Sequence, residues 1–148
     1  MLEAGLAAAG LVALATVAGL LWRALDGRRR RGSGQRVRPA DVALPADAFG
    51  ARGTLLQFST AFCTRCPATR RVLGEAADRT AGIRHAEVDL TERADLASRF
   101  HVLQTPTTLV LDARGAVRAR FGGAPRPADV AALLAELVPA ADPTGARP

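Results

Sequence analysis

The sequence is poor in the residue types that build metal centres. Its 148 residues include two cysteines and two histidines, and all twenty basic residues are arginine. A compact zinc finger places its two histidines about three to five positions apart. Here His85 and His101 are sixteen positions apart, and His85 lies in a strand-like pattern. A zinc site is therefore disfavoured, and we expect neither a metal nor another cofactor.

The distribution of charge excludes an extended nucleic-acid-binding surface. The formal net charge is +6 and the isoelectric point is near 11.2, as in many proteins that bind nucleic acid. Seven arginines, however, lie in one short stretch before residue 40: Arg23, Arg28, Arg29, Arg30, Arg31, Arg36 and Arg38. Residues 40–148 carry 13 arginines against 12 acidic residues, a balance of +1. The basic character belongs to one segment, so we expect no nucleic acid partner.

A long apolar run lies near the start of the sequence. Residues 4–22 are 19 positions without a charge, and at ~1.5 Å per residue a helix over them spans ~28 Å, close to the ~30 Å hydrocarbon core of a bilayer. Trp22 ends the run, where an interfacial aromatic is expected. A cleaved secretory signal needs basic residues before the run, and none precedes it. We therefore predict a single-pass transmembrane anchor over residues 1–25.

The charges around this run predict its orientation. All seven of these arginines follow the run. By the positive-inside rule this places the rest of the chain in the cytoplasm. Residues 26–39 are predicted to form an Arg-rich juxtamembrane linker, a flexible tether whose arginines would face anionic lipid headgroups. An extracytoplasmic domain is the alternative.

Residues 40–139 show the alternating pattern of an α/β domain. Runs with strand character cover residues 54–59, 83–89, 107–112 and 116–121. Helical patterns cover residues 68–81 and 91–100, and a last helix starts at Pro127. This order predicts a mixed central sheet flanked by helices. The Pro-containing residues 140–148 are predicted to form a disordered tail.

Cys63 and Cys66 lie two residues apart between a predicted strand and a predicted helix, an arrangement typical of a redox pair. At a helix N-terminus, free backbone N–H groups and the helix dipole stabilise a thiolate at Cys63. Arg65 adds a cation that favours the same charged state. We expect Cys63 to attack substrate and Cys66 to resolve the mixed disulfide.

The cysteine pair has two simpler explanations. A structural disulfide is disfavoured because so short a loop constrains the unfolded chain very little. A chance pair of inert, buried thiols stays open.

With these residues in view, residues 54–137 resemble thioredoxin and its membrane-tethered relatives. The matching features are the strand LLQFS, the motif FCTRC, the segment QTPT before a strand, and FGG. The resemblance implies the thioredoxin fold, with a cis proline at Pro106 beside the active-site disulfide. It implies that the backbone of Thr105 pairs with an extended substrate segment, and that Gly122 and Gly123 line the same groove.

The sequence departs from the family pattern at several positions. Phe62 stands where thioredoxins usually have tryptophan, and Thr64-Arg65 replaces Gly-Pro. Gln57 matches the buried aspartate that moves protons, and the usual lysine partner of that aspartate falls near His85. Gln57 and His85 are therefore the candidate acid/base positions, although Gln57 cannot titrate and a strand histidine is often only structural. The span before residue 54 is short for the family's first strand and helix, so a trimmed N-terminal edge is expected.

Together these features predict a thiol–disulfide oxidoreductase that reduces protein disulfides at the membrane. Such an enzyme would take electrons from an upstream donor such as a thioredoxin reductase, and it would act in redox homeostasis and electron transport. Its partners would be disulfide-containing proteins and membrane lipid. The alternatives are an extracytoplasmic thiol oxidant or maturation factor, and a redox-silent peptide-binding module.

Overall fold

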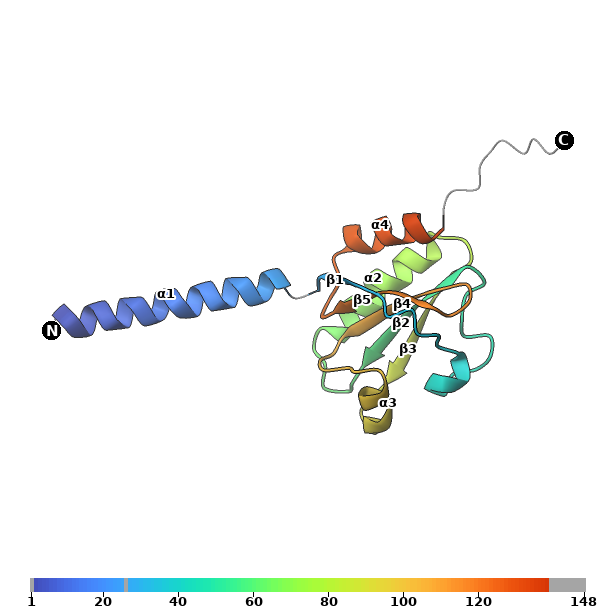
Figure 1. Cartoon of the computed structure of the whole chain (residues 1–148), viewed down its shortest axis with the longest axis horizontal. Helices are drawn as coiled ribbons and strands as arrows, with labels where there is room; N and C mark the ends of the chain where they lie inside the picture. Colours follow the sequence, from blue (N-terminus) through green and yellow to red (C-terminus); the bar gives the residue numbers. More distant parts are fainter. Residues whose placement is uncertain (1, 26, 139–148) are drawn as a thin grey trace.

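The centre of the structure is a five-stranded mixed sheet (Figure 1). This computed structural model describes residues 2–25 and 27–138. Its elements are α1 (Leu2–Leu25), β1 (Arg29–Arg31), the 3-10 helix η1 (Pro39–Val42), β2 (Gly53–Ser59), α2 (Cys66–Asp78), β3 (Ile83–Asp89), α3 (Ala94–Arg99), β4 (Thr107–Asp112), β5 (Val117–Gly122) and α4 (Pro127–Leu137). The sheet order is β1-β5-β4-β2-β3, and only the β2–β3 pair is parallel. The predicted α/β class with a mixed sheet is confirmed.

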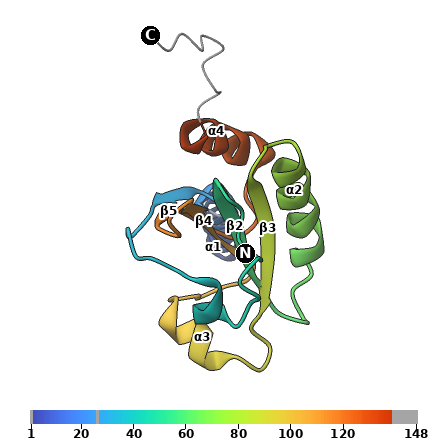
Figure 2. The same ribbon diagram turned by 90° about the vertical axis from the view of Figure 1, so that its right-hand side faces the viewer.

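Helices cover both faces of the sheet. Helices α2 and α4 pack on one face, and α3 and η1 pack on the other (Figure 2). Leu55 and Leu56 of β2 belong to the two opposite cores, and each is 0% exposed. Strand β2 is buried along its whole length, including its polar residues Thr54, Gln57 and Ser59. A strand buried on both faces of a sheet lacks the strict alternation of apolar and polar residues.

The helix that follows the cysteine pair begins earlier than the sequence pattern indicates. Helix α2 starts at Cys66, two residues before the predicted start. Pro67 fits in its first turn because the first backbone N–H groups of a helix have no partner inside the helix. Helix α3 is shorter than predicted and covers Ala94–Arg99.

The apolar run near the start of the sequence forms helix α1, which extends away from the sheet (Figure 1). Side chains such as Leu11 and Leu14 are exposed along it. Among residues 2–25 and 27–138, no helix is found that is long and apolar enough to cross a membrane. The predicted tail, residues 140–148, lies outside the described residues.

The segment expected to be a flexible tether is instead part of the folded domain. Strand β1 pairs antiparallel with β5, and Arg36 forms a further bridge to Ala116. Val37, which follows, is 1% exposed and belongs to the core. A three-residue edge strand needs no apolar side chain because its main-chain hydrogen bonds provide the pairing, so the sequence pattern does not reveal it. The part before β2 was expected to be shorter than the first strand and helix of the family, and its elements here are the three-residue β1 and the four-residue η1.

Candidate active site

The two cysteines form a disulfide at the start of α2. The S–S distance is 2.08 Å and the two Cα atoms are 5.4 Å apart. Cys63 lies in the turn before α2, where its N–H donates to the Thr60 carbonyl, and Cys66 is the first helical residue. Cys66 is 3% exposed, whereas Cys63 is only partly buried. Cys63 is thus the sulfur within reach of a partner protein.

The segment that precedes β4 lies next to the chain that leads into the disulfide. The Thr105–Pro106 peptide bond is cis, as the resemblance implies. The hydroxyl of Thr105 is 3.3 Å from the hydroxyl of Thr60, and the N–H of Gly123 donates to the Pro106 carbonyl at 2.8 Å. Three of the sequence-predicted groove positions therefore come together here, and Gly122 is the last residue of the adjacent β5.

Two large apolar side chains are exposed in the segments that form this site. Phe62, next to Cys63, is 87% exposed. Leu103, two residues before Thr105, is 95% exposed and was not singled out from the sequence. An unpartnered apolar side chain in each of the two segments gives a substrate protein something to bury against. Arg65, the remaining predicted tuning residue, is exposed at the residue that precedes α2.

A buried amide lies beneath the disulfide. Gln57 is 0% exposed, and its Nε2 donates to the backbone oxygen of Cys66 at 3.2 Å. The Gln57 Oε1 is 3.1 Å from Nε2 of His85. Burial lowers the pKa of His85, an effect that Glu87 opposes and Arg70 reinforces. Of the two candidate acid/base positions, Gln57 thus contacts the backbone of Cys66 directly, and His85 contacts the amide of Gln57.

Glu87 is a titratable group of the site that the sequence did not single out. A cavity of about 340 Å³ beside the disulfide is lined by both cysteines, Glu87 and Arg70. The Glu87 carboxylate accepts two hydrogen bonds from the Arg70 guanidinium, at 2.5 and 2.9 Å. Burial works to raise the pKa of Glu87, but hydrogen bonds from Arg70 and Ser59 outweigh it and hold the pKa below its usual value. The cavity therefore holds an ionised carboxylate.

The position of Glu87 follows from strand register. Gln57 of β2 and Glu87 of β3 are directly paired, and Gln57 Nε2 is 3.5 Å from Glu87 Oε1. His85 and Glu87 lie two residues apart on the same face of β3. The two-residue spacing in the sequence indicates that His85 and Glu87 share a face. Only the register of β2 and β3 shows which of the two lies beside the cysteines.

Comparison with known proteins identifies a related family. The sequence model of the thioredoxin family matches residues 48–136. This range includes both cysteines, Glu87 and the cis proline. No curated protein sequence matches the chain significantly.

Several solved structures with a similar fold are thioredoxins. A mutant thioredoxin from Halobacterium salinarum is 21% identical, with a TM-score of 0.53 over 62% of this chain and 79% of that one. Thioredoxin-2 of a malaria parasite is 23% identical, with a TM-score of 0.51 over 57% of this chain and 82% of that one. The germline thioredoxin Deadhead of Drosophila melanogaster is 20% identical, with a TM-score of 0.51 over 60% and 83%. At identities this low, the structural similarity establishes a shared fold alone.

Proposed function

The chain belongs to the thioredoxin family, and from this premise we propose that it is a dithiol reductase of protein disulfides. The thioredoxin fold with its Cys63–Cys66 pair supports thiol–disulfide exchange in general. Our assignment of Cys63 as the attacking residue rests on the unequal burial of the pair, because Cys63 is accessible and Cys66 is buried. The accessible sulfur meets the substrate, and the buried one stays within the enzyme.

In the first step, the thiolate of reduced Cys63 attacks one sulfur of a substrate disulfide. A bond forms between Cys63 Sγ and that sulfur, the substrate S–S bond breaks, and the other substrate sulfur leaves as a thiolate that takes up a proton. An extended substrate segment would lie along the backbone of Thr105 in the manner of an added strand. Phe62 and Leu103 would supply apolar contact on either side.

In the second step, Cys66 resolves the mixed disulfide. Its thiol gives a proton to the Glu87 carboxylate, and the resulting thiolate attacks Cys63 Sγ. The intramolecular disulfide forms, and the second substrate sulfur leaves as a thiolate that takes up a proton. The substrate has then gained two electrons and two protons. The enzyme has lost two electrons and the Cys66 proton, which Glu87 passes to the leaving substrate thiolate, and the other proton comes from water. An upstream donor such as a thioredoxin reductase would restore the dithiol.

We further propose that the substrates lie at the cytoplasmic surface of a membrane. This part rests on the sequence, namely the uncharged residues 4–22 and the arginines that follow them. One hydrogen bond in the fold supports this placement. The N–H of Gly27, just after α1, donates to the carbonyl of Gly122, and Gly122 lies beside the expected groove. The helix thus joins the domain at the same end as the redox pair. Sedimentation of the protein with membranes tests the association, and labelling of cysteines in intact cells with a thiol reagent that does not cross membranes tests the side. Recovery in the supernatant, or labelling from outside, would contradict the placement.

The reduction potential of the Cys63–Cys66 pair distinguishes the alternatives. Equilibration of the full chain with glutathione gives the reduction potential of the pair. A value near about −270 mV agrees with a cytosolic reductant, and a value near about −120 mV agrees with an extracytoplasmic oxidant. A redox-silent binding module would lose nothing on Cys63→Ser.

The central experiment traps the reaction intermediate. Cys66→Ser leaves Cys63 able to attack but removes resolution, so reduced variant protein mixed with a disulfide-containing protein such as insulin should accumulate a covalent mixed disulfide. The matched control, Cys63→Ser, should accumulate none. Equal trapping by both variants, or by neither, would contradict the proposed roles.

A further inference from the structure

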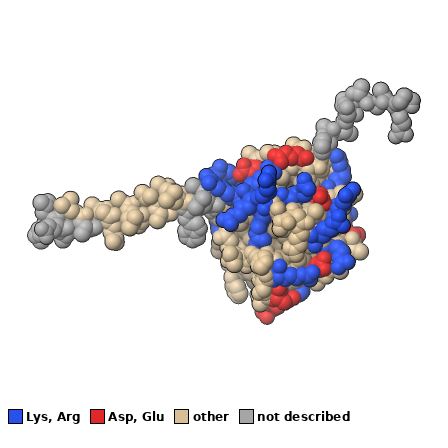
Figure 3. Space-filling model, viewed as in Figure 1, with Lys and Arg blue, Asp and Glu red and all other residues tan. Residues whose placement is uncertain are grey.

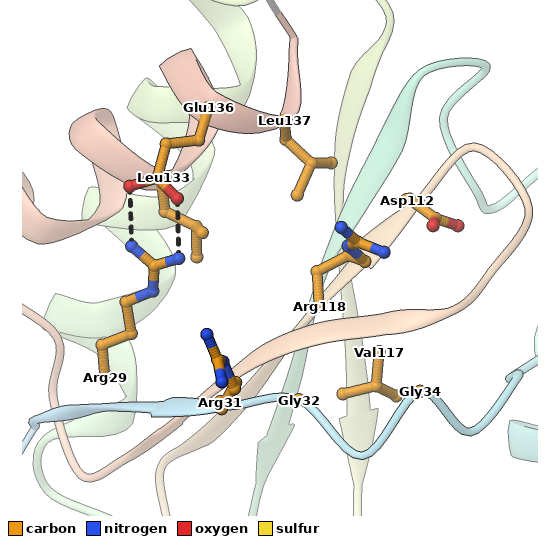
Figure 4. Close-up of a pocket in the computed structure, with 10 residues that line it drawn as sticks. All are labelled: Arg29, Arg31, Gly32, Gly34, Asp112, Val117, Arg118, Leu133, Glu136 and Leu137. Atoms are coloured by element: carbon orange, nitrogen blue, oxygen red, sulfur yellow. Dashed lines mark hydrogen bonds and ion pairs between the residues drawn. The ribbon is translucent and has the colours of Figure 1, made fainter.

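A second cavity lies away from the disulfide, between β1, β5 and α4 (Figure 4). It has a volume of about 680 Å³ and shares no lining residue with the cavity beside Cys63. Its walls carry three arginines, namely Arg29 and Arg31 from β1 and Arg118 from β5. Arginine side chains also gather on the surface around this part of the molecule (Figure 3). The cavity is therefore a basic recess built by the segment that was expected to be a flexible tether.

The backbone of the sheet directs these arginines to one side. In β1, alternation places Arg29 and Arg31 on the same face, the face covered by α4. In β5 the register with β4 shifts, because Val110 pairs with Ala119 but Leu111 pairs with Val117. Arg118 is the extra residue of this bulge, and its side chain lines the same cavity as Arg31 (Figure 4). Bulges commonly redirect a side chain in this way.

The three arginines do not have the same ionic partners. Arg29 donates two hydrogen bonds to the Glu136 carboxylate, at 2.8 and 2.7 Å, so its charge is balanced. Within residues 2–25 and 27–138, Arg31 and Arg118 form no ion pair with a carboxylate. Asp112 also lines the cavity, but its Oδ1 accepts the backbone N–H groups of the following hairpin loop. Two guanidinium groups are therefore available to a ligand.

Gly32 allows β1 to lie close to β5 at one wall of the cavity. The N–H of Gly32 donates to the Arg118 carbonyl at 2.9 Å, and a Cβ on Gly32 would collide with the carbonyl oxygen of Val117. Any larger residue there would push β1 away from β5 and separate Arg31 from Arg118. The close approach of the two strands, and with it the spacing of the two cations, depends on this glycine.

We propose that this cavity binds a phosphate group through Arg31 and Arg118. Each guanidinium presents a planar fork of N–H donors that matches the oxygens of a phosphate, and a tetrahedral oxyanion has enough oxygens to accept both forks. The volume suits a small phosphorylated molecule or a lipid headgroup. Arg29 and Glu136 close one side of the recess as a fixed ion pair. The site is independent of the proposed redox chemistry.

The test measures binding of two phosphate probes to the full chain. Pyrophosphate in solution represents a free phosphorylated ligand, and vesicles of phosphatidylglycerol with phosphatidylcholine represent a lipid headgroup. Arg31→Gln with Arg118→Gln removes the two forks. Arg36→Gln with Arg114→Gln is the matched control, because both of its arginines are exposed, lie outside the cavity, and carry the same total charge. The α1 helix is common to every variant, so any difference comes from the substituted arginines.

We expect the cavity variant to lose at least about tenfold in affinity for a probe that the unaltered protein binds, and the control to stay within about twofold. Arg31→Lys with Arg118→Lys keeps the charge but removes the forks, and it should bind more weakly than the unaltered protein. Pyrophosphate binding that depends on Arg31 and Arg118 identifies a soluble ligand. Vesicle binding that depends on these two arginines, without pyrophosphate binding, identifies a headgroup. Equal losses in the cavity and control variants, or no binding of either probe, would overturn the proposal.

Discussion

Gln57 and Glu87 lie directly opposite each other on β2 and β3, and the amide nitrogen of Gln57 contacts both the Cys66 backbone oxygen and the Glu87 carboxylate. The position of Gln57 matches that of the buried aspartate expected from the resemblance to thioredoxin. In this chain the acidic group is on the neighbouring strand, and the amide connects it to the buried cysteine. We therefore propose Glu87, rather than the residue at position 57, as the proton acceptor during resolution.

Glu87→Gln should slow the resolving step and leave the first attack unchanged. General bases typically contribute about 10²- to 10⁴-fold, and the low pKa of Glu87 places it at the weak end, so we expect a loss of at least about tenfold. Rapid-quench measurement of the mixed disulfide would show it accumulating before it decays. Glu75→Gln, an exposed position on α2, is the control. Unchanged decay of the intermediate in Glu87→Gln would remove this residue from the mechanism.

Arg70→Gln should raise the pKa of Glu87, because burial then acts without the opposing hydrogen bonds from Arg70. In the unaltered protein the folded-state pKa lies below the ordinary value of 4.5. The pair therefore stabilises the fold above that pH, and its contribution is lost as the pH falls through the folded-state pKa.

Arg70→Gln should accordingly be less stable than the unaltered protein at pH 7 and indistinguishable from it at strongly acid pH. The difference should be small, because the Arg70 side chain is 58% exposed and solvent screens the ion pair. Urea unfolding at both pH values measures it, and the neighbouring Arg71→Gln serves as the control. A stability difference that grew as the pH fell would contradict the sign of the pKa shift.

The sequence predicted the features that depend on local spacing and missed those that depend on pairing between strands. The cysteine pair and the alternation of strands and helices are local, and the cis peptide bond at Pro106 followed from the family resemblance. Glu87 was missed because its approach to the cysteines requires the β2–β3 register. Strand β1 was missed because its edge pairing relies on backbone hydrogen bonds, so three arginines form it as well as apolar residues would.

Val37→Ala tests whether the segment after β1 belongs to the folded core. Val37 is 1% exposed, so removing two methyl groups should lower the free energy of unfolding by about 1–3 kcal/mol. Val12→Ala makes the same change on α1, where the side chain is 66% exposed, and should have little effect. Denaturant unfolding of the two variants gives the comparison. Equal stability would mean that this segment is a tether after all.

Arg65→Gln should make the cysteine pair more reducing. The cation precedes α2 and lies between the two cysteines in sequence. We expect it there to favour the Cys63 thiolate and hence the reduced form of the pair. A stabilised reduced form raises the reduction potential, so removing the charge should move the potential in the negative direction, by about 10–30 mV. Equilibration with glutathione measures the shift. Arg71→Gln removes a charge from the exposed surface of α2 and should leave the potential within a few mV, on the order of 5. A positive shift in Arg65→Gln would mean that Arg65 stabilises the disulfide form, and Phe62 would then be the next side chain to test.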